Sequence, residues 1–146
     1  MDRAENYCRQ NGSRLTSKRK QVLSALLGSK KALSAYELID VHEQLFDDKL
    51  AATSMYRILD FLREEHLVHK LDLANKYVAC SHIACGHECV ASQFLICTQC
   101  QIVKEVSVSQ PTVGELKSTI EEAGFQLAST QLEINCICDR CARDAA

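Results

Sequence analysis

The stretch of sequence that decides the fold is residues 53–80, TSMYRILDFLREEHLVHKLDLANKYVAC. Over residues 53–65, apolar side chains recur at i, i+3, i+4 and i+7, which predicts an amphipathic helix with its stripe at Met55, Ile58, Leu59 and Leu62. Residues 67–71 and 76–80 are rich in Leu, Val and Tyr, and the DLAN between them is typical of a turn. We therefore predict a helix followed directly by a β-hairpin, as in the second half of a winged helix-turn-helix.

Two more helices are predicted before this stretch. Residues 16–28, TSKRKQVLSALLG, have apolar residues at helical spacing, and Gly28 is a candidate left-handed stop. Ser34 and Glu37 form a capping-box pattern that opens a helix over 34–46, with an apolar face at Leu38, Val41 and Leu45. The 34–46 and 53–65 helices would form the helix-turn-helix pair, with the second as the recognition helix and Thr53 or Ser54 as its N-cap.

The second half of the chain reads as a small sheet with one helix. We predict strands at 93–97 and 101–108, separated by a turn from Cys97 to Cys100, and a strand at 125–135 before a cysteine-rich tail. Pro111 suits the first turn of a helix that runs to about Ala123 and ends at Gly124, with Val113, Leu116 and Ile120 facing inward. The composition changes near residue 80, so we predict an α+β protein with domains at 1–80 and 81–146.

Bulk properties exclude several classes of protein. A net charge of −2 weighs against a non-specific nucleic-acid binder, although residues 1–76 hold 13 Lys and Arg against 11 Asp and Glu. The sequence contains neither an export signal nor a run of about 20 apolar residues, so we expect a cytoplasmic protein with no membrane association. Cytoplasmic thiols stay reduced, so the nine cysteines suggest metal ligands or redox thiols before disulfides.

Arg57 is the first candidate for DNA recognition. At about 100° per residue it lies roughly 150° from the centre of the apolar stripe, so it points outward near the start of the recognition helix. The guanidinium group of arginine can donate hydrogen bonds to O6 and N7 of guanine together. Tyr56 and Ser54 flank Arg57 and could reach phosphate, sugar or a thymine methyl. The alternative is an ordinary surface arginine, but the order of helices and hairpin favours recognition.

Two Cys-x-x-Cys units, CTQC and CDRC, predict a structural zinc site made of Cys97, Cys100, Cys138 and Cys141. A thioredoxin-like interpretation is disfavoured because we expect neither pair to open a helix after a strand in a βαβ unit. His69 and Cys80 flank the predicted domain boundary. A mixed site drawing ligands from both halves would couple metal occupancy to domain geometry.

The sequence resembles the ferric uptake regulator family, in particular its zinc-responsive branch. The motifs RLTSKRKQVL, SAYEL, SMYRILDFLREEHLVHKLD, YVAC, FLICTQCQIVKEV and CDRC occur in the family's order, from about Arg14 to Cys141. The resemblance implies a homodimer on operator DNA, with an N-terminal winged-helix domain and a C-terminal α/β dimerisation domain. It also implies structural zinc on the four cysteines and operator contacts from Tyr36, Tyr56 and Arg57. A regulatory zinc would be held by His69, Cys80, Glu105 and a residue of HIACGHEC.

The loop HIACGHEC departs from the family pattern. Iron-sensing members carry a histidine-rich run here, and the expected histidine position falls at Val90. We predict His87 as the missing ligand, with Cys89, Cys85 and His82 as alternatives. A thiolate ligand such as Cys80 favours zinc over iron(II) or manganese. Cys8 and Cys136 receive no role.

The resulting hypothesis is a zinc-dependent repressor of zinc-uptake genes with two zinc ions per chain, one structural and one regulatory. The alternatives are a sensor of another metal or of oxidants, a thiol redox protein, and a zinc-stabilised interaction module that binds no DNA. The sequence contains no P-loop, no dinucleotide-binding glycines and no His-Glu-x-x-His. We therefore expect no enzymatic activity.

Overall fold

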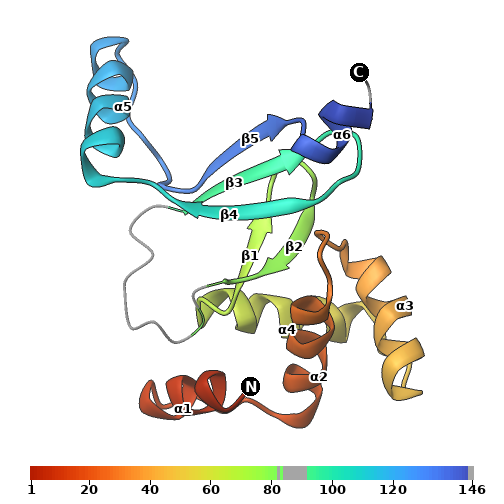
Figure 1. The fold of residues 1–146 in the computed structure, drawn as a ribbon. Helices are drawn as coiled ribbons and strands as arrows, with labels where there is room; N and C mark the ends of the chain where they lie inside the picture. The colour runs from red at the N-terminus through yellow and green to blue at the C-terminus, as the bar shows by residue number, and fades with distance from the viewer. Residues whose placement is uncertain (82, 84–91, 145–146) are drawn as a thin grey trace. The chain divides into compact units, whose positions relative to one another are not determined.

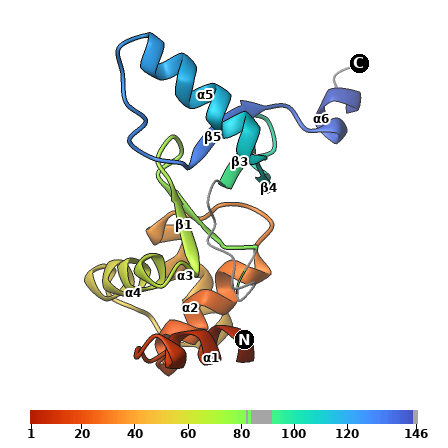
Figure 2. The ribbon, with the colours of Figure 1, turned by 90° about the vertical axis from the view of Figure 1, so that its left-hand side faces the viewer.

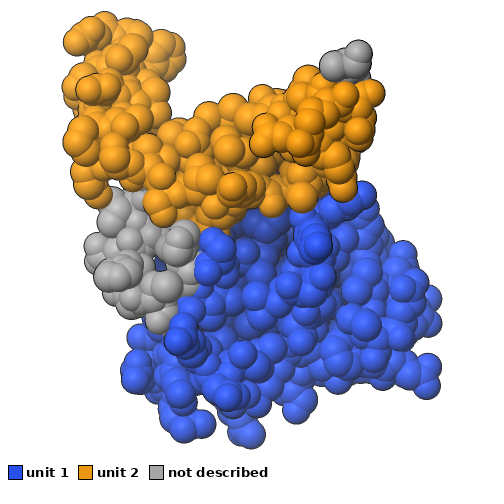
Figure 3. Space-filling view, in the orientation of Figure 1, with its two compact units in different colours: residues 1–86 blue, residues 87–146 orange. Residues whose placement is uncertain are grey.

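The fold is described from a computed structural model that covers residues 1–81, 83 and 92–144. The chain divides into two compact units, residues 1–86 and 87–146 (Figure 3). No helix in these described residues is both long enough and apolar enough to cross a membrane.

Unit 1 contains the predicted order of helices and hairpin, preceded by one additional helix (Figure 1). Strands β1 and β2 pair antiparallel, with Val68 opposite Ala79 and Leu71 opposite Lys76. The recognition helix and the wing of the predicted winged helix-turn-helix are therefore α4 and the β1–β2 hairpin. The elements are α1 (Asp2–Gln10), α2 (Ser17–Gly28), α3 (Ala35–Phe46), α4 (Ala52–Glu64), β1 (Val68–Leu71) and β2 (Lys76–Ala79).

The apolar stripe of α4 is buried, as the sequence predicted: Met55, Ile58, Leu59 and Leu62 are at most 9% exposed. They pack in one hydrophobic cluster with residues of α1, α2 and α3 and with the start of β1. Four helices and a hairpin thus share a single core, because each presents one apolar face to the others.

Three details of unit 1 differ from the prediction. Helix α4 begins at Ala52 with Ala51 as N-cap, so Thr53 and Ser54 lie inside its first turn and do not cap it. Gly28 is the last residue of α2 and is followed by an extended Ser29, so no left-handed stop ends this helix. On α3, Leu45 is 60% exposed; the buried face is formed by Leu38, Ile39 and His42, whose ring nitrogens lie within hydrogen-bonding distance of Asp48 O and Gln21 Oε1.

The predicted capping box at the start of α3 is present and also anchors the wing. The backbone N–H of Ser34 donates to Glu37 Oε2 at 2.7 Å, and the backbone N–H of Glu37 donates to Ser34 Oγ at 3.2 Å. Lys76 on β2 donates to the other Glu37 oxygen at 3.1 Å. These bonds, led by the Ser34 N–H, lower the pKa of Glu37.

Helix α1 was not predicted. Its apolar residues are few, but Ala4 and Cys8 lie one turn apart and are almost completely buried in the core of unit 1. An ion pair between Glu5 and Lys20 of α2 joins the two helices. In the sequence, only the i, i+4 spacing of Ala4 and Cys8 indicates a helix with a buried face here.

Unit 2 is a three-stranded sheet with two helices, α5 and α6 (Figure 2). Strand β3 is central, antiparallel to β4 and parallel to β5. The predicted strand at 125–135 was too long, because only its C-terminal part pairs with β3. The elements are β3 (Ser92–Cys97), β4 (Val103–Ser107), α5 (Gln110–Glu122), β5 (Leu132–Cys136) and α6 (Asp139–Asp144).

Helix α5 begins and ends close to the predicted positions, with Ser109 as N-cap and Gly124 at a φ of 82° after its C-terminus. Val113, Leu116 and Ile120 share one face but are only half-buried, and α5 has no buried residue. The three residues predicted to face inward thus form the less exposed face of α5, although none of them is buried.

Candidate metal centre and recognition helix

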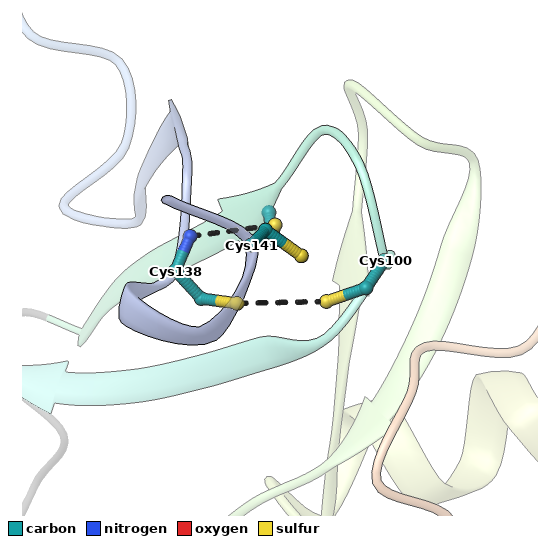
Figure 4. Close-up of side chains that lie close together, drawn as sticks. Cys100, Cys138 and Cys141 are labelled. Atoms are coloured by element: carbon teal, nitrogen blue, oxygen red, sulfur yellow. Dashed lines mark hydrogen bonds between the residues drawn. The ribbon is translucent and has the colours of Figure 1, made fainter. Parts of the chain in front are cut away.

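The sheet of unit 2 brings the two Cys-x-x-Cys pairs together. Cys97 ends β3, and Cys100 lies three residues further, in the turn before β4. Because β5 runs parallel to β3 with Cys136 opposite Cys97, the chain leaves β5 beside the same turn. It then places Cys138 just before α6 and Cys141 in its first turn, and Figure 4 shows both beside Cys100.

The four thiols have the spacing of a tetrahedral metal site. The Sγ atoms of Cys97, Cys100, Cys138 and Cys141 all lie within 4.8 Å of one another. Those of Cys100 and Cys138 are 3.7 Å apart, and a tetrahedron with zinc–sulfur bonds of about 2.3 Å has edges of about 3.8 Å. The donor set and its spacing therefore fit a zinc ion.

The electrostatics of the cluster support the same conclusion. Backbone N–H groups of Cys100 and Cys138 lower the pKa of Cys97 to about 6, and the Ile102 N–H lowers the pKa of Cys100. The hydrogen bond to Cys138 raises the pKa of Cys141 to about 12. Four neighbouring thiols cannot all ionise against one another, whereas a divalent cation among them favours four thiolates.

The Cys138–Cys141 pair lies at the start of a helix, but not in the βαβ setting of a thioredoxin-like motif. The Cys138–Cys141 pair does open a helix after a strand, since α6 follows β5. However, α6 is only six residues long, and no strand follows it among the described residues, so it forms no βαβ unit. Cys97, the thiol with the lowered pKa, is only 2% exposed, whereas reactive redox thiols are accessible.

Arg140 is a residue of this cluster that the sequence did not single out. Its interaction with Cys100, and then with Cys138 and Cys141, raises the pKa of its guanidinium. A cation beside a thiolate cluster offsets part of the cluster's negative charge. In the sequence, only the place of Arg140 between the two cysteines of CDRC indicates that it belongs to this cluster.

His69 and Cys80 lie on the same face of the wing hairpin. His69 is opposite Val78, and the backbone N–H of Cys80 donates to Leu67 O at 2.9 Å, which continues the same register. Residues 67 and 69 therefore share a face with residues 78 and 80, and His69 and Cys80 are diagonal neighbours on it.

The other predicted regulatory ligands belong to unit 2 or to undescribed residues. Glu105 is on β4 opposite Phe94 and accepts a 2.8 Å hydrogen bond from Ser92 Oγ. His87 lies outside the described residues, as do the alternatives His82, Cys85 and Cys89. The complete regulatory ligand set therefore stays a prediction.

The residues predicted to contact DNA are exposed on the two helices of the helix-turn-helix. Tyr36 on α3 is 66% exposed, and Tyr56 on α4 is 41% exposed. Arg57 is exposed as well, on the side of α4 away from its buried stripe. It lines an open groove between the N-terminal ends of α2 and α4, together with Ser54 and Lys18.

Comparison with known proteins places this arrangement among metal-dependent regulators. Residues 10–135 match the model of the ferric uptake regulator family. The zinc uptake regulation protein of Escherichia coli (strain K12) is 32% identical over 138 residues, which is 94% of this chain and 78% of that protein.

Two solved structures are similar along nearly the whole chain. A zinc uptake regulator complexed with zinc and DNA has a TM-score of 0.84 at 30% identity, covering 98% of this chain and 93% of that one. Holo XcZur has a TM-score of 0.78 at 34% identity, covering 95% of this chain and 94% of that one.

Proposed function

The chain belongs to the ferric uptake regulator family, and we propose that it is a zinc-responsive transcriptional repressor that binds operator DNA as a homodimer. The fold agrees with this role, with a winged-helix domain at the N-terminus and an α/β dimerisation domain at the C-terminus. The observation that carries the proposal is the four-thiol cluster in a chain similar throughout to zinc uptake regulators. The genes under its control would be those of zinc uptake.

Two zinc ions per chain are proposed. Cys97, Cys100, Cys138 and Cys141 would hold the structural ion permanently, because all four ligands come from one unit and saturate a tetrahedral site. The ion would supply the cross-link between the β3–β4 turn and α6. No coordination position is left for a substrate, so the site would stabilise the fold without catalysing a reaction.

The second, regulatory zinc would be held by His69, Cys80, His87 and Glu105. The first two are neighbours on the wing, and Glu105 and His87 belong to the other unit. Ligands drawn from both units would couple occupancy to the position of the winged domain. Zinc would then favour the DNA-competent form, and DNA would raise the affinity for zinc by the same factor.

In this proposal, Arg57 reads a guanine edge from the N-terminal part of α4, and Tyr36 and Tyr56 contact the operator beside it. Their exposure and the buried stripe on the opposite side of α4 support the assignment. A dimer would present two such helices to the two halves of a palindromic site. The protein would act in the cytoplasm and would not be an enzyme.

The test combines zinc content with DNA binding. Protein purified under reducing conditions should contain two zinc ions per chain, and mild chelation should remove one while leaving the dimer intact. Duplexes selected from a random pool in the presence of zinc should then bind only the two-zinc form. A single zinc that never exchanges, or selection without any sequence preference, would contradict the proposal.

Cys80→Ser separates the two sites. The variant should remain a folded dimer with one zinc per chain and should lose zinc-dependent binding to the selected duplex. Size-exclusion chromatography and metal analysis measure both effects. An unfolded variant would mean that Cys80 is structural and that the division into two sites is wrong.

A further inference from the structure

The segment from Arg9 to Lys20 is strongly basic. It contains five cationic side chains and no acidic one: Arg9, Arg14, Lys18, Arg19 and Lys20. Three of them lie in the first turn of α2, where the helix dipole disfavours cations, and no acidic residue is present there. Helix stability therefore does not explain these charges, and a departure from local preference often marks a binding surface.

Two adjoining grooves connect this segment to the recognition helix. The first lies between α2 and α4 and is lined by Lys18, Ser54 and Arg57. The second lies between α1 and the start of α2 and is lined by Arg9 and Lys20. Thr16 and Ser17 line both, so the cations form one continuous track from Arg57 to α1.

Some of these cations already have partners and others do not. Lys20 pairs with Glu5, which is the only acidic residue among the described residues that line the two grooves. Lys18 pairs with Asp48 at 3.2 Å, but its side chain stays 57% exposed. Within the described residues, neither Arg9 nor Arg57 forms an ion pair, so both ends of the track have a free positive charge.

The track is held in a fixed shape. The Arg19 guanidinium lies 3.4 Å over the ring of Phe61 of α4, and its Nη1 donates to the Arg14 carbonyl at 2.6 Å. Helix α1 is fixed in turn by Ala4 and Cys8, which are buried in the core of unit 1. The helices that carry Arg9 and Arg57 are thus held in place by packing before any ligand binds, which lowers the entropic cost of binding.

We propose that this corner between α1 and α2 binds the phosphodiester backbone of DNA next to the base pairs read by Arg57, with Arg9 and Lys18 as contacting cations. The inference rests on the proposed function and extends the DNA-binding surface to α1. A regularly spaced polyanion fits a track of cations better than a small anion, because the charges are distributed along it rather than gathered in one pocket.

Phosphate contacts and base contacts leave different signatures. A lost phosphate contact weakens binding to every sequence and reduces the slope of log K against log salt by about 0.9. A dimer loses two contacts per variant, so the slope should fall by about 2. A lost base contact weakens only the cognate sequence.

The experiment measures fluorescence anisotropy of the zinc-loaded dimer on two duplexes, one selected from a random pool and one of unrelated sequence, over a series of salt concentrations. Arg9→Gln should flatten the salt slope by about 2 and weaken both duplexes by roughly 10- to 100-fold near 0.1 M salt. Lys18→Gln should act in the same direction. Arg57→Ala should weaken the selected duplex far more than the unrelated one, because it removes a base contact as well as a charge.

Arg3→Gln is the matched control, since Arg3 is exposed on the same helix but lines neither groove. It should leave the slope close to that of the wild type. If Arg9→Gln and Arg3→Gln give the same slope while the wild type still selects a sequence, the track proposal is wrong and the proposed function stands. If the wild type selects no sequence, the proposed function itself fails.

Discussion

The two units differ in what stabilises them. Unit 1 has a continuous cluster of eighteen buried residues drawn from all four helices and the hairpin. Among the described residues of unit 2 only five are buried, two of them thiols of the four-cysteine cluster, and α5 buries none. Unit 1 is therefore stabilised by apolar burial, whereas unit 2 has little such burial. In the proposed function, the zinc held by the four cysteines would supply much of the stability that unit 2 lacks.

The largest effect should come from Cys138→Ser. Apparent zinc binding at such sites contributes about 10–16 kcal/mol, far more than the few buried side chains of unit 2 can replace. The variant should lose the structural zinc and the dimer, while the recognition helix stays folded. Hydrogen exchange should find β3 and β5 amides unprotected and α4 amides still protected. If the β3 amides stayed protected without zinc, unit 2 would not need the metal for its fold, and the two units would not differ in this way.

The second effect tests the core of unit 1. Leu59→Ala removes a completely buried side chain from α4 and should lower the free energy of unfolding of unit 1 by about 2–5 kcal/mol. Leu45→Ala makes the same chemical change where the side chain is 60% exposed, and should cost less than about 0.5 kcal/mol. Urea unfolding followed at a unit 1 probe measures both. Equal costs would mean that burial does not stabilise unit 1.

The difference between the units also explains which parts of the fold were predictable. In unit 1 the i, i+3, i+4 and i+7 stripe of α4 and the DLAN turn are local signals, and both were found in the structure. The exact N-cap of α4 was missed because Ala51 takes that position although it has no capping side chain. Helix α1 was missed because its buried face is only Ala4 and Cys8.

Long-range pairing was harder to predict than local structure. The length of β5 depends on where β3 ends, since only residues opposite β3 can pair, and no local pattern at 125–131 encodes this. The four thiols were predictable because the Cys-x-x-Cys spacing itself makes a chelating turn. The basic track was only half visible: its charges are in the sequence, but their connection to Arg57 needs the packing of α2 against α4.

A smaller effect concerns pH. The pKa of Glu37 is lowered in the folded chain, so its contribution to stability is complete above its unfolded pKa and is lost as the pH falls through the folded value. Glu37→Gln should therefore flatten the decline in the stability of unit 1 below about pH 5. The effect should stay under about 1 kcal/mol because the side chain is 47% exposed. Urea midpoints from pH 3 to 7 measure it, and unit 2 should not respond to this change.

The smallest effect is expected from Cys136→Ser, which is also the matched control for Cys138→Ser. Cys136 lies opposite Cys97, but its Sγ contacts the Ile134 carbonyl at 3.5 Å and is not one of the four clustered thiols. Serine keeps a donor for that carbonyl, so zinc content and the dimer should not change. If Cys136→Ser lost zinc as Cys138→Ser does, five thiols would share the site. Unit 2 would then depend on the whole end of β5 rather than on two Cys-x-x-Cys turns.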